Sequence, residues 1–114
     1  MSVKLTTRQV GDVTVIDANG RITLGEGSST FRDTIKDLTA RGNKKLLLNL
    51  GDVSYIDSSG IGEMVSGFTS VTNQGGELKL LNLNKRVKDL LQITKLYTVF
   101  EVFEDEAAAV PSFS

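Results

Sequence analysis

The apolar run Leu46-Leu47-Leu48-Asn49-Leu50, near the middle of the chain, most strongly constrains the fold. It is nearly continuous in apolar residues and has the length of a strand. This pattern is typical of a central strand that is buried on both faces. Such a strand needs helices to cover its sheet, and strand–helix–strand units of this kind are parallel with right-handed crossovers.

The chain before this run predicts an antiparallel pair of strands. One β-favouring run ends at Val10, and a second extends from Val13 to Ala18. Gly11-Asp12 between them is a typical hairpin signal. Residues 19–29 are rich in glycine, serine and asparagine, which predicts a loop before the first helix.

Three helices are expected from apolar residues at helical spacing, bounded by capping residues and glycines. The first is capped by Ser28 or Ser29 and ends at Gly42-Asn43. The second ends at Gly75-Gly76, and the third is capped by Asn84. Their apolar stripes are, in order, Phe31, Ile35 and Leu38; Ile61, Met64, Val65, Phe68 and Val71; and Val87, Leu90 and Leu91.

The remaining segments complete an alternating order. Residues 78–83 and the segment from Val99 to Phe103 are predicted strands, and Asp105 opens a short terminal helix that Pro111 stops. The expected fold is α/β, one domain over residues 1–114. Its mixed sheet is opened by an antiparallel hairpin and covered by about four helices.

Composition excludes several classes of function. The chain has no cysteine and no histidine, which excludes disulfides, thiolate metal sites and a Ser-His-Asp triad. Its 13 basic and 14 acidic residues leave a net charge of −1, so nothing indicates direct nucleic-acid binding. The N-terminus lacks the features of a signal peptide, and no apolar run could span a membrane, so a cytoplasmic location is expected.

The stretch from Asp57 to Gly62, Asp-Ser-Ser-Gly-Ile-Gly, is the strongest candidate for a functional site. It follows a buried strand and opens a helix, where α/β proteins place their sites and where free N–H groups favour a phosphate. One of Asp57, Ser58 and Ser59 is expected to cap the helix. Two glycines in its first turns cost roughly 1 kcal/mol each relative to alanine, which indicates a role beyond capping.

The same stretch lacks the requirements of common catalytic motifs. A P-loop would need a Gly-Lys-Ser/Thr ending, and no lysine follows Gly62. A serine hydrolase elbow would need Gly-x-Ser-x-Gly and a histidine. Asp17, Asp52 and Asp57 show no metal-site spacing. No catalytic residue, metal or cofactor is therefore expected, and the chain is not expected to be an enzyme.

Together, the stretches around residues 48–62 and Gly75-Gly76-Glu77-Leu78 resemble the STAS domain, and more narrowly the single-domain anti-sigma factor antagonists. The resemblance covers nearly the whole chain. It implies a partner switch in which an anti-sigma factor with kinase activity phosphorylates Ser58 and a serine phosphatase reverses the modification. The unphosphorylated form would bind the anti-sigma factor and release a sigma factor.

The resemblance also implies a partner-binding surface. Asp57 would shape the site, and Ser59 would be its neighbour. The chain departs from the family pattern at Gly20-Arg21-Ile22-Thr23, because an aspartate expected near Thr23 is absent. Arg21 is either a partner contact or a solvated arginine. The expected partner-binding residues are Asp57, Ser58, Ser59, Gly60, Ile61, Gly62, Arg21 and Thr23.

Other readings of the chain stay open. Similar small proteins act as accessory subunits of ABC-type lipid transporters, and a nucleotide-binding regulatory module is a further alternative. Lys85, Arg86 and Lys88 form either a solvated helix face or a contact for an acidic partner. The chain is expected to be a monomer or a weak dimer, with apolar residues near the last strand packed inside or against another copy.

Overall fold

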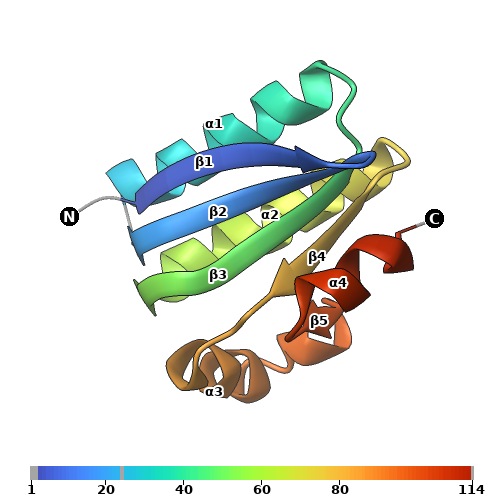
Figure 1. Cartoon of the computed structure of the whole chain (residues 1–114). Coiled ribbons are helices and arrows are strands. Elements are labelled where there is room, and N and C mark those ends of the chain that lie inside the picture. Colours follow the sequence, from blue (N-terminus) through green and yellow to red (C-terminus); the bar gives the residue numbers. More distant parts are fainter. Residues whose placement is uncertain (1–2, 24, 114) are drawn as a thin grey trace.

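The computed structural model describes residues 3–23 and 25–113, and it confirms the mixed α/β sheet. Its five strands lie in chain order, and only β1 and β2 are antiparallel (Figure 1). The strands are β1 (Val3–Val10), β2 (Val13–Ile22), β3 (Lys45–Ile56), β4 (Glu77–Leu81) and β5 (Val102–Phe103). The helices are α1 (Glu26–Ala40), α2 (Ser58–Asn73), α3 (Lys85–Ile93) and α4 (Glu106–Ala109), with 3₁₀ turns at Leu96–Thr98 and Val110–Ser112.

The leucine-rich run forms the central strand that its pattern predicts. β3 pairs with β2 on one side and with β4 on the other. Leu46, Leu47, Leu48 and Leu50 are fully buried. Successive side chains of a strand point to opposite faces, so this one strand supplies apolar side chains to both sides of the sheet.

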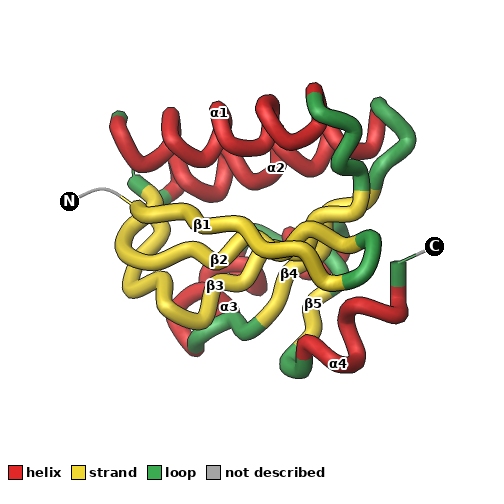
Figure 2. Tube along the Cα trace, turned by 45° about the horizontal axis from the view of Figure 1, so that its top comes forward, coloured by secondary structure: helices red, strands yellow, loops and turns green. Residues whose placement is uncertain are grey.

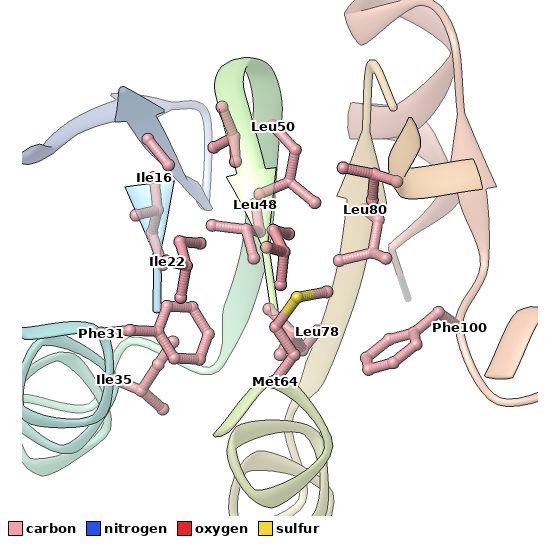
Figure 3. Close-up of a cluster of buried hydrophobic side chains, with 14 of the residues drawn as sticks. Ile16, Ile22, Phe31, Ile35, Leu48, Leu50, Met64, Leu78, Leu80 and Phe100 are labelled. Carbon is pink, nitrogen blue, oxygen red and sulfur yellow. The ribbon is translucent and has the colours of Figure 1, made fainter. Parts of the chain in front are cut away.

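Helices cover both faces, and each face has its own apolar layer. α1 and α2 lie along one face, and α4 lies on the other (Figure 2). In the larger layer, Phe31 of α1 and Met64 of α2 point toward the sheet, and Phe100 lies at the end of the layer next to β4 (Figure 3). The smaller layer contains Leu47, Leu81, Ala109 and Phe113 together with two valines of β2.

β2 and β3 are both longer than expected. Because β2 runs to Ile22 and α1 begins at Glu26, the prediction of a loop over residues 19–29 is wrong. β2 continues to Ile22, and β3 continues to Ile56 instead of ending in a turn after Leu50. The register of β2 against β3 shifts twice, once between positions 17 and 19 and once between positions 20 and 21. These irregularities let β2 continue through residues that signal a loop.

The start of α1 also differs from the prediction. The helix begins at Glu26, and its N-cap is Gly25 with φ of 94°, which needs no side-chain cap. Ser29 lies within the first turn, where its backbone N–H donates to the Gly25 carbonyl at 3.0 Å. The side chain of Ser28 lies outside the described part of the chain.

The last predicted strand is shorter than expected. Only Val102 and Phe103 pair with β4. A 3₁₀ turn at Leu96–Thr98 precedes them, and Phe100 is buried in the larger apolar cluster. The terminal helix α4 has Asp105 as its N-cap, as predicted, and it ends at Ala109, two residues before Pro111, which lies in the following 3₁₀ turn. Within residues 3–23 and 25–113, no helix has the length and apolar character needed to cross a membrane.

Candidate functional site

The Asp-Ser-Ser-Gly stretch lies at the junction of β3 and α2, as predicted. Asp57 is the N-cap: its Oδ1 accepts a hydrogen bond of 2.9 Å from the backbone N–H of Gly60. Its own N–H donates to the carbonyl of Ile22 at 3.3 Å, which ties the junction to the end of β2. Asp57 is therefore the capping residue among the three candidates. Ser58 is exposed at the first position of α2, and Ser59 is partly buried beside it.

The two glycines of the stretch have different surroundings. Gly60 is buried, and a Cβ there would lie 2.3 Å from the Ile22 carbonyl oxygen and 2.7 Å from Cγ2 of Ile56. Only glycine lets α2 approach the ends of β2 and β3 this closely. In the described part of the chain, a Cβ at Gly62 would meet no neighbouring element within 4 Å. Gly62 is thus an open surface position, whereas Gly60 and the buried Ile61 hold α2 in place.

Arg21 and Thr23 lie at the end of β2 and just after it. Arg21 pairs with Tyr55 across the β2–β3 ladder, and its guanidinium carbon lies 5.1 Å from the centre of the tyrosine ring. Arg86 of α3 lies over the same ring at 5.7 Å. Thr23 is partly buried. Tyr55 was not among the expected site residues, because its place in the site depends on a cross-strand register that local patterns do not reveal.

A groove of about 690 Å³ lies where the end of β3, the start of α2 and the length of α3 meet. Ile56, Leu90 and Ile93 supply apolar lining. The polar and aromatic lining residues are Tyr55, Asp57, Ser58, Lys85, Arg86 and Asp89. The hydroxyl-bearing Ser58 thus shares a groove with two cations from another helix.

Asn84 fixes the wall that α3 contributes to this groove. Its Oδ1 accepts from the N–H of Val87 at 2.9 Å, which confirms the predicted cap. Its Nδ2 donates to the Val53 carbonyl of β3 at 2.6 Å. The structure also divides the predicted basic cluster, because Lys88 lies outside the groove lining and pairs with Glu104 at 3.0 Å.

Ion pairs at other places in the fold shift the pKa of three carboxyls. Arg8 holds the pKa values of Asp17 and Glu106 below their ordinary values, chiefly by hydrogen bonds to both side chains. Lys45 lowers the pKa of Asp12 in the same way. None of these carboxyls lines the groove at Ser58.

The sequence profile of the STAS domain matches residues 4–109. The chain is 40% identical over 72 residues to the anti-sigma-B factor antagonist of Bacillus subtilis, a match that covers 63% of this chain and 65% of that protein. It is 31% identical over 102 residues to a Thermotoga neapolitana protein provisionally named as an anti-sigma factor antagonist, with 89% of each chain covered.

Solved structures agree with this assignment at the level of the fold. The anti-sigma factor antagonist SpoIIAA in its unphosphorylated form superposes with a TM-score of 0.70, at 20% identity and over 95% of this chain and 96% of that one. The phosphorylated form of Bacillus SpoIIAA gives a TM-score of 0.74 at the same identity, over 95% and 97%. From its profile match and its fold, the chain belongs to the STAS-domain family.

Proposed function

We propose that this protein is an anti-sigma factor antagonist, a binding switch controlled by phosphorylation of Ser58. The observation that carries the proposal is the exposed Ser58 hydroxyl at the first position of α2, directly after a capping Asp57. The names of the two relatives described above support the same function. In this proposal the unphosphorylated form binds an anti-sigma factor with serine kinase activity, and the sigma factor is released.

Electrostatics explains why phosphorylation of Ser58 would weaken binding of the partner. A phosphate adds about −1.5 to −2 charges at neutral pH, and a charge buried unpaired in an interface costs several kcal/mol. A loss of about 2.8 kcal/mol weakens an interface about a hundredfold. The switch then needs no change of fold, because the phosphate itself excludes the partner. A serine phosphatase restores binding, and the protein itself acts without catalysis.

The accessible members of the site form the proposed partner surface. Ser58 and Gly62 of α2 are exposed, and Arg21 is exposed at the end of β2. Asp57, Ser59 and Thr23 are partly buried beside them. Gly60 and Ile61, which are buried, contribute by holding α2 against the strand ends.

Phosphorylation with a lysate of the source organism tests the proposal. The purified protein is incubated with ATP and the lysate, and intact mass and peptide mapping then locate any phosphate. We expect one phosphate on Ser58, absent from Ser58→Ala and retained in the matched Ser59→Ala variant. If the protein stays unmodified while other proteins in the lysate are labelled, the switch is wrong. Co-purification with a membrane complex would then test the role as a transporter accessory subunit.

A further inference from the structure

The groove at Ser58 is lined by several charged side chains. Four charged side chains line it: Lys85 and Arg86, and the carboxylates of Asp57 and Asp89. Asp57 is engaged as the cap of α2. The Arg86 guanidinium lies over the ring of Tyr55, an interaction that is weak at exposed sites. Arg86 therefore lines the same groove as Ser58, and its contact with Tyr55 is one that a stronger partner can replace.

We propose that Lys85 and Arg86 form an internal binding site for the phosphate carried by Ser58. This inference rests on the proposed phosphorylation of that residue. A guanidinium binds phosphate through two parallel hydrogen bonds, which are stronger than neutral hydrogen bonds and stronger than an exposed contact with an aromatic face. Once Ser58 is phosphorylated, Arg86 leaves Tyr55 for the phosphate, and Lys85 adds a second positive charge.

The fold supports this role through the way α3 is held. Asn84 caps α3 and also bonds to the Val53 carbonyl of β3, so Lys85 and Arg86 begin a helix that is fixed to the strand leading to Ser58. The amino-terminal ends of α2 and α3, at Ser58 and Lys85, both border the groove, and helix amino-termini favour negative charge. The phosphate is thus received by two side chains and by two helix ends.

Binding of the phosphate by Lys85 and Arg86 changes how phosphorylation affects a partner protein. In the unphosphorylated protein, Lys85 and Arg86 are available to acidic groups of the partner. In the phosphorylated protein the phosphate occupies both cations, so the partner loses these contacts and meets the bulk of the phosphate in the groove. The switch therefore acts across the groove as well as at the modified residue.

The phosphate has several charged or titratable neighbours, and they act in opposite directions. Lys85 and Arg86 of α3 lower its second pKa, while Asp57 before α2 and Asp89 of α3 raise it. From the strands, Arg21 of β2 lies over the ring of Tyr55, which also lines the groove. The test is therefore a difference between variants rather than the pKa value of the parent protein.

The test uses full-length protein with phosphoserine installed at position 58 by genetic code expansion, so that no kinase is needed. The second pKa of the phosphate, ordinarily about 6, is followed by ³¹P NMR. We expect Arg86→Gln and Lys85→Gln each to raise it by about 0.5 unit, since a nearby cation favours the dianion. Lys88→Gln is the matched control, because Lys88 is on the same helix but outside the groove lining, and it should leave the pKa unchanged.

A second readout follows Tyr55. Its ring resonances should shift between the unphosphorylated and phosphorylated forms, and Arg86→Gln should abolish most of that shift. If both groove variants leave the phosphate pKa within about 0.1 unit of the parent, as Lys88→Gln does, the internal site does not exist. Because the phosphoserine is installed directly, these results are independent of whether a kinase modifies Ser58.

Discussion

At the residue scale, the site depends on three nearby positions with different tasks. Asp57 caps α2, Ser58 presents its hydroxyl to solvent, and Gly60 allows the helix to touch the Ile22 carbonyl. The capping and packing tasks belong to the fold, and the exposed hydroxyl is left for modification. Substitutions at these positions should therefore separate stability from binding.

A charge at Ser58 should affect binding and leave stability nearly unchanged. Ser58 is exposed at the start of a helix, where a carboxylate interacts favourably with the helix dipole by about 0.3–1 kcal/mol. We expect Ser58→Asp to keep or slightly raise Tm and to weaken capture of the anti-sigma factor about a hundredfold. Thr69→Asp, exposed farther along α2, is the control that should still bind. Tight binding by Ser58→Asp would contradict the switch.

The two glycines should respond oppositely to the same methyl group. Gly60→Ala should lower the free energy of unfolding by about 1–3 kcal/mol or more, because the Cβ would collide with the Ile22 carbonyl. Gly62→Ala should raise it by about 0.5–1 kcal/mol, because its surroundings are open and alanine favours the helix. Urea denaturation measures both. Equal effects at the two positions would show that Gly60 is not held by this contact.

At the scale of elements, one arginine joins three of them. Arg8 of β1 bonds to Asp17 of β2 at 2.7 Å and to Glu106 of α4 at 2.5 Å. These contacts connect the hairpin to the short helix that covers the smaller apolar layer. Both carboxyls have lowered pKa values, so the network stabilises the fold only while they are ionised.

Removal of this arginine should have a pH-dependent effect. The stabilisation is present above the unfolded-state pKa values of Asp17 and Glu106, about 3.9 and 4.3, and it is lost as pH falls through the lower folded-state values. Arg8→Gln should therefore cost about 0.5–1 kcal/mol at pH 7, a modest amount because the pairs are partly exposed, and almost nothing near pH 2. Arg41→Gln, which removes only the exposed pair with Asp37, is the control with a smaller effect. A difference that persists at pH 2 would exclude this ionic origin.

At the scale of the whole molecule, the sheet separates two apolar layers of unequal size. The larger one lies under α1 and α2, and the smaller one lies under α4 and the final 3₁₀ turn. Phe31 is fully buried in the first layer, whereas Phe113 is 9% exposed in the second. The helix that carries Ser58 belongs to the larger layer, so the site is attached to the more extensive core.

The two layers should differ in what they contribute to stability. Phe31→Ala should cost about 3–5 kcal/mol, and Phe113→Ala should cost less, about 2–3 kcal/mol, because its ring is at the edge of the smaller layer. Urea denaturation followed by circular dichroism and by tyrosine fluorescence measures both losses. Coincident transitions would show that the layers unfold together. A larger loss for Phe113→Ala would reverse the ranking of the layers.

The order of elements and the core could be read from local patterns. Three features appear in the structure as predicted: the apolar run at β3, the helical stripe from Phe31 to Leu38 and the Asn84 cap. Each depends only on residues close to it in the sequence. The position of Ser58 at the start of a helix could be predicted for the same reason. The ends of β2 and β3 were missed because pairing between strands carries them through loop-like residues.

Local sequence patterns specify the alternating order, the buried central strand and the placement of the Asp-Ser-Ser-Gly stretch at a helix start. Only the folded sheet shows why Gly60 must be glycine and how Arg21, Tyr55 and Arg86 meet at the groove that Ser58 lines. The two groups of features differ in the distance along the chain over which their interactions act. Periodicity and capping act within one element, whereas these contacts join β2, β3, α2 and α3, whose approach only the folded sheet establishes.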